Sequence, residues 1–291
     1  MIISMVKYSD INDPLFREAV VAIDNGDTNF LQQTISTHPY LVANRLDFPK
    51  KGYFKEPYLL WFVADNPIRN KKLPANILSV INILVKAIKQ YAAESFKLQI
   101  DYALGLIATG RIPRESGIQN EMMDLLINEG AEPGNGHAAL ANGNIEAARH
   151  LIKRGGMITL TTAICLDLEE NIDRLSKQAS ENDKEIALMA AAFFGNADNI
   201  KFLLQLKVNV NAWLNASSGF HSHATALHQA VYSGSFESVQ LLVEANADLN
   251  AKDKIYDGTA LEWSEYMHGE ERNETMKAKY AAIENYLSKV S

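Results

Sequence analysis

The amino-acid sequence contains two copies of one pattern, and this repetition limits the possible folds more than any other feature. Residues 186–212 (IALMAAAFFGNADNIKFLLQLKVNVNA) align with residues 225–251 (TALHQAVYSGSFESVQLLVEANADLNA) at an offset of 39. Small and apolar residues share positions in the two copies, Gly195 matches Gly234, and both copies end in Asn-Ala. Segments with such a shared pattern are copies of one structural unit. One unit cannot bury its apolar face alone, so we expect the units to stack on one another.

The residue types in the second copy predict a pair of helices. The hydroxyl of Thr225 suits an N-cap, where it accepts a hydrogen bond from an unpaired backbone N–H. Gly234 suits the left-handed residue that ends a helix. Ala230 is small, as expected where helices of adjacent units approach closely, and Leu242 of the second helix matches Leu203 of the first copy. We therefore expect Leu203, Ala230 and Leu242 to be buried between units.

This repeating unit resembles the ankyrin repeat. The resemblance rests on TALH at residues 225–228, the Leu pair at residues 241–242 and ADLNA at residues 247–251. A further start, DGTAL at residues 257–261, comes 34 residues after the first TAL. The segments PYLLWFVADNPIRN, DYALGLIATGR and GFHSHATALHQA, in this order, look like those of a group of bacterial ankyrin-repeat proteins. The resemblance implies an all-α, ankyrin-like α-solenoid of stacked helix-pair repeats with projecting finger loops.

We predict about eight repeats in a single domain that spans residues 1–291. The boundaries are irregular N-terminal repeats at 10–133, shortened repeats at 134–184, regular repeats at 185–255 and a C-terminal capping repeat at 256–291. In the capping repeat, residues 280–290 should form the closing helix, because their apolar residues recur at helical spacing. A different solenoid of helical pairs is the alternative architecture, and the Asn-Ala and Asp-Gly turns of the fingers argue against it.

Composition and charge exclude several classes of protein. The net charge of −7 divides into +1 for residues 1–128 and −8 for residues 129–291, which disfavours bulk binding of nucleic acid. The single cysteine, Cys165, excludes an internal disulfide framework and suits a reducing compartment. The longest clean apolar run, Ile186–Phe194, has nine residues, whereas a membrane span needs about 20. The first residues lack the pattern of a secretory signal, so we expect a cytoplasmic protein.

Two insertions rich in basic residues interrupt the second and third repeats, at residues 67–79 (PIRNKKLPANILS) and 111–118 (RIPRESGI). Because adjacent repeats stack, we expect these insertions to be loops that lie side by side on one edge. They hold five cations: Arg69, Lys71, Lys72, Arg111 and Arg114. Arginine offers paired contacts to phosphate or carboxylate, so the edge is a candidate anion-binding site. The alternative is a pair of solvated loops whose charges aid solubility or pair with Glu115.

The sixth repeat ends in a long finger, residues 213–224 (WLNASSGFHSHA). His221 and His223 would share one face of an extended strand, and His228 follows on the next helix. Three imidazoles suit a transition metal, but no Cys or carboxylate in the segment completes a ligand set. His228 occupies the Thr-x-x-His position of the repeat, where a bond to nearby backbone is the simpler role. We therefore predict a polar contact finger and no metal.

Aromatic residues recur two positions before the glycine that ends the first helix of a repeat. Phe193 and Tyr232 occupy this position in the sixth and seventh repeats, and Tyr266 occupies it in the eighth by the same alignment. Cys165, interpreted as a small buried hydrophobe, holds the position in the short fifth repeat. Successive aromatic side chains facing the concave groove would provide the anchors that protein interfaces use. The alternative is that the rings only pack on one another or under the fingers.

These patterns predict a non-catalytic scaffold that binds a protein partner through the concave groove and the finger tips. The candidate partner-binding residues are Phe193, Tyr232, Tyr266, Trp213, His221 and His223. The alternative function is a protein that binds an anion or a small ligand at the Arg-rich edge loops of the second and third repeats. No catalytic residue, cofactor, nucleic acid or membrane is expected, and we expect a monomer.

Overall fold

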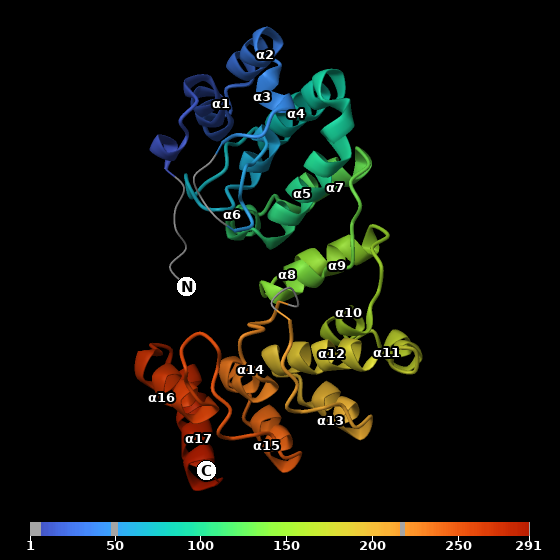
Figure 1. The fold of residues 1–291 in the computed structure, drawn as a ribbon, viewed down its shortest axis with the longest axis vertical. Coiled ribbons are helices and arrows are strands. Elements are labelled where there is room, and N and C mark those ends of the chain that lie inside the picture. Colours follow the sequence, from blue (N-terminus) through green and yellow to red (C-terminus); the bar gives the residue numbers. More distant parts are fainter. Residues whose placement is uncertain (1–6, 48–51, 216–218, 291) are drawn as a thin grey trace. The chain divides into compact units, whose positions relative to one another are not determined.

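The computed structural model describes residues 7–47, 52–215 and 219–290, and every regular element within these residues is a helix (Figure 1). The predicted all-α fold class is therefore confirmed. Contacts within the chain define two compact units. The first comprises Met1–Ala139 and Glu146–Met157, and the second comprises Leu140–Ile145 and Ile158–Ser291. The division passes through two short helices, α8 (His137–Ala141) and α9 (Ile145–Lys153).

The other helices of the first unit are, in chain order, η1 (Tyr8–Asp10), α1 (Pro14–Asn25), α2 (Thr28–Thr37), α3 (Tyr40–Ala43), η2 (Leu59–Ala64), α4 (Ile77–Tyr91), η3 (Ala93–Ser95), α5 (Phe96–Thr109), α6 (Arg111–Glu115) and α7 (Gln119–Asn128). The elements η1, η2 and η3 are 3-10 helices. All six residues of η2 are buried, and α1, α4 and α5 pack against it. This short helix is therefore the centre of the first unit.

Local signals explain where helices of the first unit begin and end. The Asp13 carboxylate accepts a hydrogen bond from the Phe16 backbone N–H at 3.0 Å, and Pro14 follows as the first helical residue of α1. Gly26 ends α1 in the left-handed conformation with φ 70°. Asp27 then caps α2 through the backbone N–H of Phe30 at 3.0 Å. One Gly-Asp pair thus turns the chain from α1 into α2.

The basic insertion at residues 111–118 differs from the expected loop. Arg111–Glu115 form the helix α6, which starts directly after Gly110. Pro113 is compatible with this helix because it lies in the first turn, where a backbone N–H has no intrahelical partner. The buried side chains of Ile112 and Pro113 hold α6 against the core of the unit.

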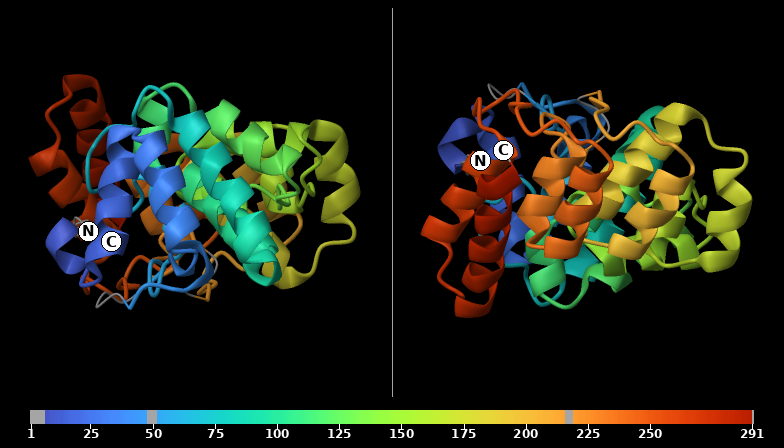
Figure 2. Two further views of the ribbon diagram at one scale, coloured as in Figure 1. Left: turned by 90° about the horizontal axis from the view of Figure 1, so that it is seen from above. Right: turned by 90° about the horizontal axis from the view of Figure 1, so that it is seen from below.

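The second unit contains four successive pairs of helices: α10 (Leu160–Cys165) with α11 (Glu169–Ser176), α12 (Glu181–Phe193) with α13 (Ala197–Gln205), α14 (Ala226–Ser233) with α15 (Phe236–Glu244), and α16 (Ala260–Glu270) with α17 (Glu274–Val290). The first helices of the pairs stack in chain order, from α10 through α12 and α14 to α16 (Figures 1 and 2). In the same order, α13 packs on α15 and α15 packs on α17. The repeat at offset 39 thus corresponds to two neighbouring pairs.

The expected details of the regular repeats are confirmed. Leu203, Ala230 and Leu242 are fully buried. Thr225 is the N-cap of α14, and Gly234 ends this helix with φ 69°. The Thr225 hydroxyl and backbone N–H both donate to Nδ1 of His228, at 2.8 and 3.4 Å. His228 therefore takes part in the cap, which the sequence interpretation assigned to the threonine alone.

Neighbouring repeats are also joined through their turns. The side-chain amide of Asn211 donates to the Asn246 carbonyl at 3.1 Å, and its oxygen accepts from the Asp248 backbone N–H at 2.8 Å. One side chain from the turn after α13 therefore satisfies two backbone groups in the turn after α15. This contact fixes the register between the two pairs.

The closing helix is longer than the sequence spacing indicates. It begins at Glu274, six residues before the expected start at Tyr280, because the Asn273 side chain accepts the Met276 backbone N–H at 3.1 Å and so caps the helix. The Tyr280 hydroxyl donates to the backbone carbonyl of Tyr232 at 3.0 Å. The longer α17 is thus hydrogen-bonded to the end of α14 in the preceding pair.

Candidate functional site: an aromatic row on the second unit

Phe193, Tyr232 and Tyr266, which we call the aromatic row, occupy matching positions on the stacked helices α12, α14 and α16. The rings of Phe193 and Tyr232 stack with their centroids 5.5 Å apart and their planes 21° apart. Tyr232 is nevertheless 38% exposed, and Tyr266 is 65% exposed. The first two rings pack on each other, as the alternative interpretation expected, and both tyrosines still face solvent.

The long finger, of which the structure describes residues 213–215 and 219–224, packs against the row through a residue that the sequence interpretation missed. Phe220 is buried, and its ring lies 5.5 Å from that of Phe193 and 6.3 Å from that of Phe194. A single aromatic residue within a polar stretch, directly after Gly219, was the available signal. Phe220 therefore anchors the finger beside the first ring of the row.

The two histidines of the finger extend the aromatic contacts beyond the row. The His221 ring lies 4.8 Å from the Tyr232 ring and 5.7 Å from the His223 ring, and the His223 ring lies 6.0 Å from both Tyr256 and Trp263. The backbone turns at His221 with φ 48°, so the histidines do not lie on an extended strand as expected. Their rings are adjacent because the chain turns.

Burial leaves parts of both histidines without hydrogen bonds. Nδ1 of His221 and Nε2 of His223 are buried and have no partner among the described residues. His228 is different, because its Nε2–H donates to the Gly258 carbonyl at 3.0 Å, which is the backbone contact expected from its position in the repeat. In the part of the chain that the structure describes, no group of three or more His, Cys, Asp or Glu side chains is placed to hold a metal ion.

The buried histidines should make the second unit sensitive to acid. Burial lowers the pKa of His221, His223 and His228 below the ordinary 6.5, and the neighbouring His223 lowers that of His221 further. Below pH 6.5 the unfolded chain then binds more protons than the folded chain, so stability falls as the pH drops through this range. We expect the urea midpoint of the second unit, followed by tryptophan fluorescence, to decrease from about pH 7.5 to about pH 5.

The matched test replaces His221 and His223 together by Gln, which does not titrate. The pH dependence of the urea midpoint should be shallower in the double variant than in the parent. Only His228 and the other titratable groups that both proteins share then remain. An unchanged slope would show that the finger histidines keep ordinary pKa values.

Residues 253–258 form a short finger, which lies next to the long finger and also presents exposed side chains. Trp213 is 40% exposed, and the ammonium of Lys254 lies 4.4 Å from the centre of its ring. The Lys254 backbone N–H donates to the His223 carbonyl at 2.8 Å and ties the two fingers together. Ile255 and Tyr256, which follow on the short finger, are exposed. The finger tips thus combine aromatic and charged groups, although Ile255 and Tyr256 were not singled out from the sequence.

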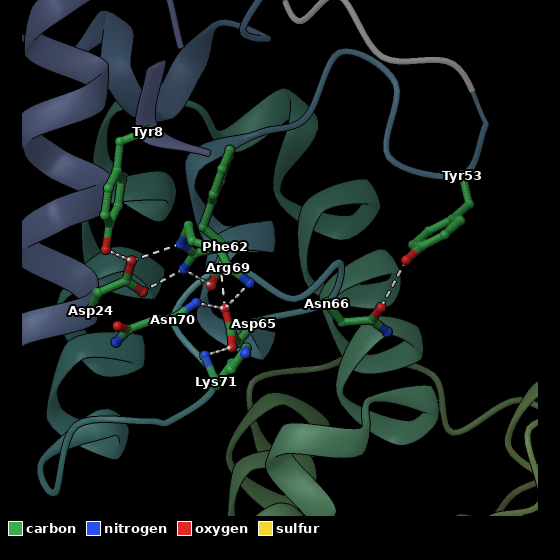
Figure 3. A network of polar contacts seen from close by, with 9 residues as sticks. All are labelled: Tyr8, Asp24, Tyr53, Phe62, Asp65, Asn66, Arg69, Asn70 and Lys71. Carbon is green, nitrogen blue, oxygen red and sulfur yellow. Dashed lines mark hydrogen bonds and ion pairs between the residues drawn. The ribbon is translucent and has the colours of Figure 1, made fainter. Parts of the chain in front are cut away.

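The candidate anion-binding edge lies in the first unit, and there Arg69 differs from the expectation. Arg69 is buried, and its guanidinium donates to the two carboxylate oxygens of Asp24 at 2.7 and 2.5 Å and to the Phe62 carbonyl at 2.8 Å (Figure 3). Tyr8 donates to the same carboxylate at 2.7 Å, and burial together with this bond raises the pKa of Tyr8 to about 12. Arg69 is therefore an internal partner of Asp24 and is not exposed on a loop.

Asp65 shapes the loop that follows. Its carboxylate accepts the backbone N–H groups of Arg69, Asn70 and Lys71 at 2.9, 3.0 and 2.8 Å (Figure 3). The carboxylate also lies 3.8 Å from the Arg69 guanidinium. A single buried carboxylate thus organises the turn and leaves the Lys71 side chain outside, where it is exposed.

Hydrogen bonds join the residues that precede the two basic segments, whereas the side-by-side placement of the segments themselves stays a prediction. The Asn66 side-chain amide donates to the Leu106 carbonyl at 3.0 Å and to the Thr109 hydroxyl at 3.1 Å, near the end of α5, directly before α6. Four of the five cations are exposed: Lys71, Lys72, Arg111 and Arg114. Arg111 lies 3.7 Å from Glu115, which is the pairing that the alternative interpretation named. Binding of an anion by these four residues stays a prediction.

Cys165 is at the end of α10, at the position that corresponds to the row in the short fifth repeat. Burial and the neighbouring Asp167 raise the pKa of its thiol to about 12. A thiol with this pKa carries almost no thiolate at neutral pH, and the thiolate is the nucleophilic form. The side chain therefore acts as a small hydrophobic group, as the sequence interpretation expected, although it is half-buried and not buried.

Comparison with known proteins finds a similarity over part of the chain. Residues 114–253 match the family model for ankyrin repeats in 3 copies. Among solved structures, the human ASB11 ankyrin repeat domain is similar at 18% identity over 68% of this chain and 91% of that chain, with a TM-score of 0.30. A search of curated proteins finds no match.

Residues 114–253 are thus similar to ankyrin repeats, and the fold is an all-helical, ankyrin-like stack of helix pairs. Ankyrin repeats are in general protein–protein interaction modules. The total of about eight repeats, and the boundaries predicted for them, stay predictions. No helix within the described residues is long and apolar enough to cross a membrane.

Proposed function

We propose that this protein is a non-catalytic interaction scaffold that binds a protein partner through the aromatic row and the two fingers. The observation that carries the proposal is the exposure of Tyr232 and Tyr266 at matching positions of adjacent helices. Exposed aromatic side chains on a rigid surface lose little entropy on binding and provide much of the anchor energy at interfaces.

The two fingers add side chains to the proposed binding surface. Phe220 anchors the long finger beside Phe193, and the Lys254–His223 backbone bond holds the short finger next to it. Trp213 and Tyr256 are then presented from loops that are positioned by a stacked helical scaffold. Loops of this kind commonly carry binding residues, because the scaffold fixes them while their side chains stay accessible.

The resemblance and the sequence provide the finer parts of this proposal. We place the protein in the cytoplasm of a bacterium, as a monomer that uses no cofactor and binds neither nucleic acid nor membrane. The excess of negative charge in residues 129–291 supports the exclusion of nucleic acid, because bulk binding of nucleic acid requires a basic surface.

The test replaces Tyr232 and Tyr266 together by Ala. Truncating an aromatic anchor typically costs about 2 kcal/mol of binding free energy, so the double variant should lose more than a hundredfold in affinity. The measurement is capture by the immobilised full chain from an extract of the source cells, with quantitative mass spectrometry of the proteins that parent and variant retain. We expect the parent to retain proteins that the double variant does not.

Tyr40→Ala is the matched control, because Tyr40 has 37% exposure, close to that of Tyr232, and lies on α3 in the first unit. This variant should retain the same proteins as the parent. Circular dichroism melting of all three proteins shows whether the fold is preserved. Equal capture by the parent and the double variant would contradict the proposed function.

A further inference from the structure

The two tyrosines of the aromatic row, Tyr232 and Tyr266, lie in a strongly acidic part of the chain. Residues 225–274, from the N-cap of α14 to the start of α17, contain ten Asp and Glu residues and three Lys and Arg residues, a net charge of −7. This value equals the net charge of the whole protein. The segment therefore concentrates negative charge around Tyr232 and Tyr266.

The acidic side chains share the surface of the rings. On α16, Glu262, Glu265 and Tyr266 are all exposed, and their spacing of three and four residues puts them on one face of the helix. On the short finger, Asp257 follows the exposed Tyr256 and is itself exposed. Each exposed tyrosine of α16 and the short finger thus has a carboxylate neighbour in the sequence.

Asp253 differs from these exposed acidic residues, because its hydrogen bonds fix the conformation of the short finger. It is buried, and it accepts the backbone N–H groups of Ile255, Tyr256 and Gly258 at 2.9, 2.8 and 3.1 Å. It also accepts the Trp263 indole N–H at 3.0 Å. Because these bonds fold the short finger back on α16, Tyr256 and Asp257 project outward from a fixed turn.

The same surface already holds one cation against an aromatic ring. The Lys254 ammonium lies 4.4 Å from the centre of the exposed Trp213 ring. Lys252, the other lysine of this region, pairs with Asp257 at 3.0 Å. These contacts show that ammonium groups fit both the rings and the carboxylates here, while Tyr232, Tyr266 and Glu265 have no such cation among the described contacts.

From the exposed rings and the complementary charge, we infer that the occupant of the aromatic row is a protein segment rich in Lys and Arg. Its ammonium and guanidinium groups stack on the faces of Tyr232 and Tyr266 and pair with Glu262, Glu265 and Asp257. Cations are attracted to aromatic faces, and long-range attraction to the acidic surface speeds the encounter. This inference rests on the proposed function and adds the chemistry of the partner to it.

The experiment selects phage-displayed random peptides on the immobilised full chain, with counter-selection on the Tyr232→Ala, Tyr266→Ala double variant. The peptides that survive bind through the row, and we expect Lys and Arg to be enriched among them over Asp and Glu. An enriched peptide, labelled with fluorescein, is then titrated with each protein variant and its anisotropy is followed.

Two variants that lose the same number of charges distinguish the effect of the carboxylates beside Tyr266 from the effect of the overall charge of the protein. Glu262→Gln with Glu265→Gln removes two carboxylates beside Tyr266, and Gln at residue 262 preserves the capping box with Thr259. Glu169→Gln with Glu170→Gln removes two exposed carboxylates on α11. We expect the first pair to weaken binding roughly fivefold or more and to reduce its salt dependence, and the second pair to bind like the parent.

The outcomes distinguish this inference from the function on which it rests. The inference that the partner is rich in Lys and Arg would be wrong if the row-dependent peptides showed no excess of these residues. It would also be wrong if both Gln pairs lost the same affinity. Either result would leave the proposed scaffold function standing. If no selected peptide depends on Tyr232 and Tyr266, and the capture experiment finds no row-dependent protein, both the proposed function and this inference fail.

Discussion

Replacing Arg69 by Met is expected to lower the free energy of unfolding of the first unit by about 3–5 kcal/mol. The change leaves the buried carboxylate of Asp24 without its two guanidinium bonds, and it removes the donor to the Phe62 carbonyl. Tyr8 alone then remains as a donor to Asp24 among the described contacts. A buried charge that loses its partner costs far more than a surface ion pair contributes.

The measurement is hydrogen exchange of the full chain, read for the peptides of α1, which carries Asp24, and of η2, whose Phe62 carbonyl accepts a hydrogen bond from Arg69. Both peptides should exchange faster in the variant. Arg114→Met provides the control, because Arg114 is exposed in the same unit, and its loss should change stability by less than about 0.5 kcal/mol.

A double variant identifies the cause of the loss. When Asp24→Leu accompanies Arg69→Met, no unpaired charge remains at this position in the interior, and much of the lost stability should return. If the double variant is as unstable as the single variant, the packing of the Arg69 stem near Phe62 outweighs the charge. If Arg69→Met has no effect, the pair is not buried as described.

Leu242→Ala is expected to destabilise the second unit by about 2–5 kcal/mol, because it removes buried methyl groups and leaves a cavity. Leu242 is fully buried on α15, which packs against α13, α14 and α17. A cavity at this position therefore weakens contacts within one helix pair and with both neighbouring pairs.

Urea unfolding of the full chain gives the change in stability, and hydrogen exchange of α14 and α15 assigns it to the second unit. Glu244→Ala on the same helix is the matched control, because Glu244 is exposed and its removal leaves the core intact. A Leu242→Ala protein that unfolds at the same urea concentration as the parent would refute the alignment of the two regular repeats.

The regular part of the fold was predictable because its information is local. An offset of 39 between two segments aligns Leu203 with Leu242 and Gly195 with Gly234. At each of these positions the residue type indicates the structural role. The same offset aligns Phe193 with Tyr232, and the offset of 34 between the two TAL segments aligns Tyr232 with Tyr266. All three residues lie on the first helices of adjacent pairs, as this alignment predicts. Both glycines have positive φ, at 65° and 69°, as their positions required.

The errors arose where tertiary contacts decide the outcome. Nothing near Arg69 in the sequence shows that Asp24, 45 residues earlier, will hold it inside. The segment at residues 111–118 was expected to be a loop because it interrupts a repeat, although its proline lies in the first turn of α6, where a proline is compatible with a helix. The start of α17 depends on Asn273, a cap that no periodic pattern of apolar residues marks. Phe220 stands out in the sequence only as a single aromatic residue in a polar stretch, and its packing against Phe193 and Phe194 identifies it as the anchor of the long finger.

The hydrogen bond from the Tyr280 hydroxyl to the Tyr232 carbonyl has a thermodynamic consequence. The carbonyl belongs to the same residue whose ring faces solvent in the aromatic row, and the hydroxyl belongs to α17. We therefore expect a ligand that restricts the fluctuations of Tyr232 to restrict those of α17 as well, and we expect fraying of α17 to lower the affinity for that ligand by the same factor. On the proposed function, occupancy of the row and the order of the last helix would then be two linked equilibria that share one coupling free energy.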